Sequence, residues 1–397
     1  METTASSTSI AESRLMYTLA LTTSSCGWGV FYTFTTRYIA VELHGGTLSI
    51  YVFTGASWFF TLFSLLAETV ARILTERKAL LLGVLVIIPL ILGVQITEPI
   101  TVALVFASTS IPWAITWPVV LKVVFSRRRR GLGREYGAFT VFSGWGFMAG
   151  SLLAGFLYAT GGVVLVYAVT ALLVSMPFII YYTYYTPSSS VSKTSISIIS
   201  PLKILRYTLT AICIFVLSRE LFLTQGPVKI NRELETLLPA QGEWVYYVLY
   251  GLVYSGGALI SPVARVVAGR LVDKYGSRSV LAATFTGYTL LYWSFIKTSG
   301  IIPLVLWQIP LFPLYDVAVN THVAKLLPSP LHIQGFALVT AFTATGGSLV
   351  TLLLFLGIED VNVVGLLVTI TSLISFTLLL YEKMALRVSL EPQITYS

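Results

Sequence analysis

The stretch FVLSRELFLTQ, residues 215–225, places Arg219 and Glu220 inside a run of apolar side chains. A guanidinium there would bind an anionic or polar group, because it presents several donors in a fixed plane. A carboxyl group there would exchange protons readily, because burial disfavours its charged form. Asp316 and Asn320 stand four residues apart in another apolar run, so they share one face of a helix. These residue types predict a site that binds a polar solute and carries a proton.

Aromatic residues add a second chemistry. Trp113 and Trp117 have the same four-residue spacing, and Tyr32 lies in the first apolar segment. Such rings stack on a sugar or an amphiphilic drug, or they pack against neighbouring helices, and both interpretations stay open. The three histidines and two cysteines have no metal-ligand spacing, so we expect no metal, no other cofactor and no disulfide framework.

The composition indicates what must position these residues. Of 397 residues, 56% are hydrophobic and only 11% are charged, with a mean hydropathy of +0.83. Soluble proteins carry roughly 25% charged residues. The apolar stretches reach the ~20 residues that a bilayer core requires, and they are continuous rather than alternating with period two. The sequence therefore predicts an all-α integral membrane protein.

The apolar stretches predict twelve transmembrane helices. We expect a loose tail (1–13), a six-helix bundle (14–185), a Ser-rich cytoplasmic linker (186–205), a second six-helix bundle (206–382) and a cytoplasmic tail (383–397). The predicted spans are 14–41, 48–74, 79–96, 99–125, 135–160, 162–185, 206–232, 244–272, 279–298, 301–326, 333–357 and 361–382.

Lysine and arginine indicate the orientation. Alternate loops and the termini hold 20 of the 25 basic residues, with Arg265 counted among them. This asymmetry places both termini in the cytoplasm and accounts for the net charge of +8 without nucleic acid. The densest run, Arg127 to Arg130, is expected to contact anionic headgroups of the lipid bilayer. We expect a multi-pass monomer in the plasma membrane.

Two sequence features of the first half recur in the second half at the same separation along the chain. Arg72 and Arg270 are 198 positions apart (270 − 72), and so are Gly137 and Gly335 (335 − 137). The offset is about half the chain, which indicates that the two six-helix halves are repeats with pseudo-symmetry.

The segment GRLVDKYGSR between spans eight and nine resembles a signature of the major facilitator superfamily. That signature has Gly, three residues, Asp, a basic residue, one residue, Gly and further basic residues. In the first half Ala71 and Thr75 replace the Gly and the Asp, and the turn is about three residues shorter. The resemblance implies the superfamily's fold and assigns a gating role at one end of the bundle to Gly269, Arg270, Asp273, Lys274, Gly276 and Arg278.

The chemistry of this motif follows from its residue types. Gly269 permits close approach of a neighbouring helix, and Gly276 permits the left-handed conformation of a tight turn. Asp273 would accept hydrogen bonds from Arg or Lys, or lie at a helix N-terminus, where the helix dipole favours an anion. A basic loop that only fixes orientation remains the alternative. Glu68 is expected to pair with Arg72.

The resemblance also implies that spans one, four, seven and ten line a central cavity. Adjacent residues of a helix point about 100° apart, so we expect that Arg219 and Glu220 do not both face its axis. Arg219 would bind substrate, while Glu220 or Asp316 carries a proton. An Arg219–Asp316 ion pair without substrate contact is the alternative. The predicted substrate-binding and coupling residues are Tyr32, Trp113, Trp117, Arg219, Glu220, Asp316 and Asn320.

We therefore expect a secondary active transporter that moves a small molecule by alternating access, coupled to protons, with an organic anion or another polar metabolite as substrate. A multidrug efflux antiporter and a sugar transporter remain alternatives, and a membrane enzyme acting on lipids is a remote one. No sequence of the GxxxxGK type occurs, which argues against direct use of ATP.

Overall fold

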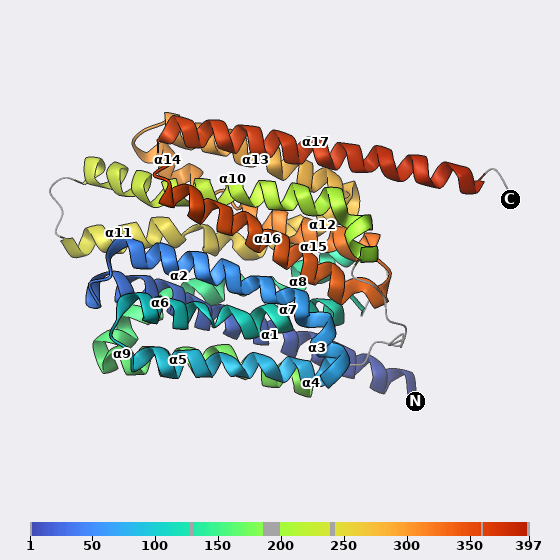
Figure 1. The fold of residues 1–397 in the computed structure, drawn as a ribbon, viewed down its shortest axis with the longest axis horizontal. Helices are drawn as coiled ribbons and strands as arrows, with labels where there is room; N and C mark the ends of the chain where they lie inside the picture. Colours follow the sequence, from blue (N-terminus) through green and yellow to red (C-terminus); the bar gives the residue numbers. More distant parts are fainter. Residues whose placement is uncertain (1, 127–130, 186–198, 239–242, 359, 395–397) are drawn as a thin grey trace.

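In the computed structural model the chain forms a bundle of helices that run side by side (Figure 1). The structure describes residues 2–126, 131–185, 199–238, 243–358 and 360–394. The basic run 127–130 and most of the linker, 186–198, lie outside the described residues. Helices up to residue 183 occupy one side of the bundle in Figure 1, and helices from residue 199 occupy the other.

Each half consists of α-helices together with short 3-10 or π-helical elements that extend or interrupt them. The first half comprises α1 (Glu2–Arg37), η1 (Tyr38–Glu42), α2 (Gly46–Thr61), η2 (Leu62–Leu66), α3 (Ala67–Leu74), α4 (Glu76–Ala79), η3 (Leu80–Val86), α5 (Ile87–Val94), α6 (Pro99–Ala107), α7 (Ser110–Ser126), α8 (Leu132–Phe139) and α9 (Ser143–Thr183). The second half comprises α10 (Ile199–Leu237), α11 (Glu243–Ser255), α12 (Gly257–Tyr275), α13 (Ser277–Lys297), α14 (Ile301–Leu306), α15 (Leu311–Leu326), η4 (Ser329–Leu331), α16 (His332–Phe355) and α17 (Val361–Ile394).

The prediction of twelve spans is confirmed. Among the described residues, ten helical stretches are long and apolar enough to cross a membrane. One of them, 132–183, is broken by Gly162 (φ 62°, ψ −162°) into two spans, and α1 supplies the remaining one. The ends differ from expectation, because residues 2–13 belong to α1 rather than to a loose tail. Likewise α10 already begins at Ile199, and α17 runs on to Ile394.

Local sequence explains where spans begin. Pro99 occupies the first turn of α6, where its missing N–H costs nothing. The Glu98 carboxylate accepts hydrogen bonds from the backbone N–H groups of Ile100 (3.0 Å) and Thr101. Hydrogen bonds from Thr101 and Ile100 lower the pKa of this exposed Glu98, which lies outside the spans. The cap thus fixes the start of the fourth span.

The two halves repeat one packing contact between their first and fifth spans. In the first half, Gly150 of α9 lies against the Cys26 carbonyl oxygen of α1, too close for any side chain. In the second half, Gly346 of α16 lies in the same way against the Cys213 carbonyl oxygen of α10. Both cysteines contribute their backbone carbonyl oxygens to this contact, and both are free thiols.

The turns that carry the motif also correspond. Thr75 (φ 74°, ψ 150°) and Gly276 (φ 86°, ψ 144°) each precede the third span of their half with nearly the same backbone conformation. Sequence comparison aligns Thr75 with Asp273 instead. The turn geometry corrects that alignment to an offset of 201 (276 − 75), because the first turn is three residues shorter. We call the end of the bundle with these turns the motif end; α1 starts and α17 ends there (Figure 1).

Thr75 should be strained, and replacing it with glycine tests this. Positive φ with extended ψ is essentially a glycine conformation and costs other residues about 1–3 kcal/mol. The Thr75 hydroxyl offers little in return, because its hydrogen bond from the Lys78 N–H is long, at 3.5 Å. We expect Thr75→Gly to raise the free energy of unfolding by about 1 kcal/mol in denaturant titrations. Thr286→Gly, inside α13, should lower it by a similar amount, and a loss at Thr75 would contradict the strain.

Each half has a buried polar cluster at the motif end. In the first half, Lys122 of α7 forms an ion pair with Glu76 of α4, and Tyr185 donates to the same carboxylate at 2.9 Å. In the second half, the centre is Glu382 of α17, which is 1% exposed. It accepts from Arg278 (3.0 Å) and Thr208, and its Oε2 lies 3.0 Å from His322 Nε2.

Candidate functional site

A cavity of about 950 Å³ lies between the two halves. Its lining comes from the first, second, fourth and fifth spans and their counterparts in the second half, with smaller contributions from the sixth and ninth. More spans therefore contribute to the cavity lining than the four that the sequence predicts. All seven predicted substrate-binding and coupling residues line it, namely Tyr32, Trp113, Trp117, Arg219, Glu220, Asp316 and Asn320.

Arg219 and Glu220 of α10 form an ion pair with each other. Arg219 Nε donates to Glu220 Oε1 at 2.9 Å, and Nη2 donates to the same oxygen. Both residues line the cavity. The alternative Arg219–Asp316 pair does not form, because each residue has another partner.

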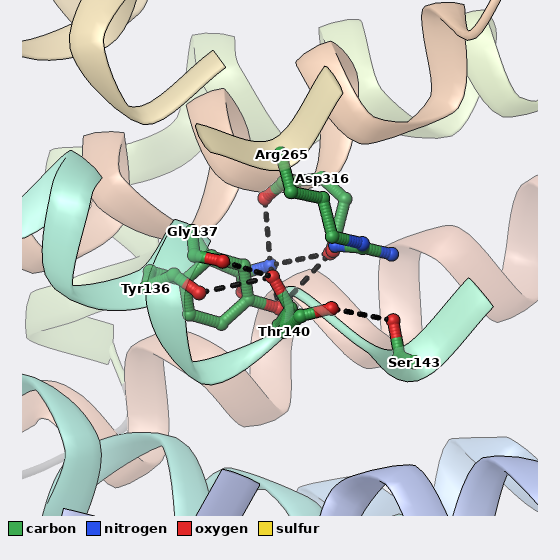
Figure 2. A network of polar contacts seen from close by, with 7 residues as sticks. Tyr136, Gly137, Thr140, Ser143, Arg265 and Asp316 are labelled. Carbon is green, nitrogen blue, oxygen red and sulfur yellow. Dashed lines mark hydrogen bonds and ion pairs between the residues drawn. The ribbon is translucent and has the colours of Figure 1, made fainter. Parts of the chain in front are cut away.

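Asp316 of α15 pairs with Arg265 of α12. Arg265 Nη1 donates to Asp316 Oδ2 at 2.6 Å (Figure 2). Arg265 is 6% exposed, so its placement among the basic loop residues is wrong. The sequence did contain a signal, because Arg265 falls inside its predicted span 244–272 within the apolar run SPVARVVAG. A charge inside such a run marks a functional-site candidate, just as Arg219 does.

Tyr136 of α8 joins this pair to the first half. Its hydroxyl donates to Asp316 Oδ1 at 3.0 Å, and Asn320 Nδ2 donates both to that oxygen and to the Tyr136 hydroxyl. The Thr140 hydroxyl in turn donates to the Tyr136 carbonyl oxygen at 2.9 Å, which fixes the end of α8 (Figure 2). The Asp316 carboxylate is thus held from three helices, and sequence analysis missed Tyr136.

Aromatic rings form the facing wall. Trp113 and Trp117 stack with ring centroids 5.6 Å apart, and Trp117 stacks on Phe139 at 6.2 Å. Phe139 contacts Tyr136 at 6.0 Å, so a continuous series of rings leads from α7 to the Asp316 network. The packing interpretation describes part of this arrangement, since Trp117 packs on Phe139 of α8. Both tryptophans also line the cavity, and their stacking on a ligand stays a prediction.

The motif joins the halves at the motif end. The Asp273 carboxylate accepts from the backbone N–H groups of Gly133 (3.0 Å) and Arg134 (3.1 Å), at the N-terminus of α8. Its Oδ2 also lies 3.8 Å from Arg134 Nε. A Cβ at Gly269 would lie 2.7 Å from the Gly133 carbonyl oxygen. The close approach and the helix N-terminus both agree with the chemistry expected of these residue types.

The other motif residues act elsewhere. Arg270 is exposed, and the exposed Lys274 lies 4.9 Å from the ring centroid of Tyr275. Arg278 belongs to the Glu382 cluster within its own half. Glu68 pairs with Arg72 at 2.8 Å, as expected from the sequence. Among the ion pairs that the described residues form, the one that joins the halves is Arg134–Asp273.

Among the described residues, no group of three or more His, Cys, Asp or Glu side chains is placed to hold a metal ion.

The family model for the Major Facilitator Superfamily matches residues 17–351. The chain belongs to this superfamily. It is therefore a multi-pass membrane protein of a family of transporters that carry small-molecule substrates, and family membership indicates a transporter rather than an enzyme. The resemblance stated from GRLVDKYGSR is confirmed.

Solved structures agree on the fold. The human organic anion transporter TETRAN is 12% identical, with a TM-score of 0.68 over 92% of this chain and 98% of that one. A bacterial homologue of the iron transporter ferroportin, in an outward-facing state, is 13% identical, with a TM-score of 0.68 over 94% and 99%. The nucleoside transporter NupG is 15% identical, with a TM-score of 0.61 over 92% and 98%. No curated protein matches the chain. These identities establish the fold alone.

Proposed function

We propose that this superfamily member is a proton-coupled carrier of a small organic anion that works by alternating access. The observation that supports this best is the cavity between the halves, where two Arg–carboxylate pairs of the second half face aromatic and hydroxyl groups of the first. Charges at membrane depth are expensive and mark substrate and proton pathways. The fold shared with TETRAN, described as an organic anion transporter, is consistent with this substrate class.

The motif supplies the moving contact in this proposal. Gly269 and Asp273 hold α12 against the start of α8, so this contact must open when the cavity opens toward the motif end. The basic residues of the loops favour a cytoplasmic location for that end, with both termini, in the plasma membrane. The protein then acts as a monomer, because each chain contains a complete cavity.

A second candidate is an efflux carrier of amphiphilic drugs. The stacked Trp113 and Trp117 favour it, because stacked rings receive flat apolar compounds well. The experiment below separates the two by the charge of the compounds carried.

The proposal is tested with the full chain in proteoliposomes and a radiolabelled set of organic anions, sugars and cationic drugs. One pH unit can drive about tenfold accumulation per coupled proton. We expect anions to accumulate with the proton gradient, and a protonophore to abolish this. Asp316→Asn or Glu220→Gln, whichever removes the proton carrier, should lose accumulation but keep substrate exchange.

The matched control is Glu235→Gln, an exposed carboxylate of the same helix as Glu220. It should accumulate anions like the unaltered chain. If both cavity variants also do so, neither carboxyl carries a coupled proton and the proposal fails. Gradient-driven movement of cationic drugs alone would instead favour the efflux carrier.

A further inference from the structure

The charges of the cavity sum to zero. Its described lining contains four fully charged side chains, two guanidiniums and two carboxylates, in the pairs Arg219–Glu220 and Arg265–Asp316. An anion that entered alone would leave an uncompensated negative charge in a partly dry site, which is unfavourable. One proton taken up with each single negative charge would keep the cavity neutral.

The two arginines differ in which of their guanidinium donors form hydrogen bonds. Arg219 uses both Nε and Nη2 on Glu220. Arg265 gives Nη1 to Asp316, while its buried Nε finds no acceptor among the described residues. A buried charged donor without a partner is costly, and Arg265 is 6% exposed. Arg265 therefore keeps a buried donor for a ligand, whereas the two Arg219 donors named above are already bound to Glu220.

Hydrogen bonds from Tyr136 and Asn320 would hold the Asp316 carboxylate in place when Arg265 changes partner. The groups that face it are Arg265 on α12, Tyr136 on α8 and Asn320 on α15, and Arg219 and Glu220 on α10 line the same cavity. Tyr136 and Asn320 both donate to Oδ1 and so hold that oxygen. Oδ2, the partner of Arg265, is the oxygen left to take a proton.

The ring wall indicates the rest of the ligand. Trp113 and Trp117 line the cavity and stack on each other, and the buried Phe139 connects Trp117 to Tyr136 of the Asp316 network. On the same side, Trp28 stacks with Tyr32 at 5.6 Å, and its buried Nε1 has no acceptor among the described residues. A planar ring that carries one anionic group, with a further acceptor, fits this wall better than an open-chain anion.

We propose that the cavity binds an aromatic monoanion together with one proton, with Arg265 as the anion-binding residue and Asp316 as the proton acceptor; this rests on the proposed function above. A proton forms an O–H bond with Asp316 Oδ2 and removes its negative charge. Arg265 stays protonated and pairs with the anionic group of the substrate instead. The cavity charge goes from zero to +1 and back to zero, so transport is electroneutral.

The test uses 2-naphthalenesulfonate, whose sulfonate stays ionised at every pH used, so that any pH effect comes from the protein. Binding to the purified full chain is measured by calorimetry at pH 5.5 and pH 8. We expect at least about tenfold tighter binding at pH 5.5, the size of one charge-assisted hydrogen bond. Asp316→Asn should bind at pH 8 as tightly as the unaltered chain does at pH 5.5, with no pH dependence.

Further variants separate binding from folding. Arg265→Gln should weaken binding about tenfold or more at pH 5.5, whereas the same change at the exposed Arg206 should have no effect. If Asp316→Asn does not fold, Tyr136→Phe serves instead, because loss of its donor should shift the onset of tight binding to higher pH. In proteoliposomes, uptake of the sulfonate with protons should produce no current.

Equal affinity at both pH values, weaker binding by Asp316→Asn at pH 8, or a measurable current would overturn the inference. So would methanesulfonate that binds as tightly as the naphthalene compound, since it has no ring. If the protein accumulates a non-aromatic anion with the proton gradient but does not bind the sulfonate, this inference fails while the proposed function stands. If no solute in the set follows the proton gradient, the proposed function itself fails.

Discussion

Replacing Gly269 with valine is expected to separate the two halves at the motif end. A Cβ at this position would lie 2.7 Å from the Gly133 carbonyl oxygen and 3.0 Å from the Arg134 Cα, which are backbone atoms and cannot move aside as a side chain can. Forcing extra volume into such a contact costs up to about 3 kcal/mol. The conformation closed at the motif end should therefore lose about 100-fold in population relative to the open one.

The separation is measured between spin labels at Ile73 and Tyr275, exposed residues at the motif end of the two halves, in a background with both cysteines replaced by alanine. We expect a longer distance in Gly269→Val and a large loss of transport rate. Gly155→Val is the matched control, because a Cβ there meets no atom within 4 Å. An unchanged distance in Gly269→Val would show that α8 and α12 do not need this contact to close.

Replacing Glu382 with alanine is expected to destabilise the second half more than any exposed change. The carboxylate is 1% exposed and receives the guanidinium of Arg278, the hydroxyl of Thr208 and the ring of His322. Removing one member of a buried pair leaves the other charge without compensation, which costs about 3 kcal/mol or more. Denaturant unfolding should show this loss of free energy.

Two comparisons make that result specific. Glu382→Gln keeps an oxygen acceptor for part of the cluster, so its loss should be smaller than that of alanine. Glu235→Ala removes an exposed carboxylate and should change stability by less than about 0.5 kcal/mol. If Glu382→Ala behaves like Glu235→Ala, the cluster contributes nothing to stability.

Much of the architecture follows from the sequence, because helix length and hydropathy are local properties. The spans, the break near residue 161 and the turn at Gly276 were all predictable from residue type and spacing. The motif residues Gly269 and Asp273 were predictable for the same reason, since a missing side chain and a carboxylate beside a helix end have few physical uses.

The ion-pair partners of the buried charges were not predictable from the sequence, because they depend on which helices pack against each other. Arg265 was misplaced, since counting basic residues near span ends cannot tell a loop side chain from one a turn or two inside the span. The pairing of Asp316 with Arg265 instead of Arg219 needs the relative rotation of α10, α12 and α15. The sequence also showed that the first turn is about three residues shorter, but the shared offset of Arg72 and Arg270 placed this shortening after Thr75. The backbone conformation places it before Thr75.

The distribution of ion pairs between the halves has a consequence for motion. Apart from Arg134–Asp273, whose arginine is 69% exposed, each ion pair that the described residues form keeps both members in one half. In the alternating-access cycle proposed above, buried charges would move together with their partners when one half rocks against the other. We expect the glycine contact between α8 and α12 to limit the rate of that cycle, and changes in ionic strength to alter turnover only weakly.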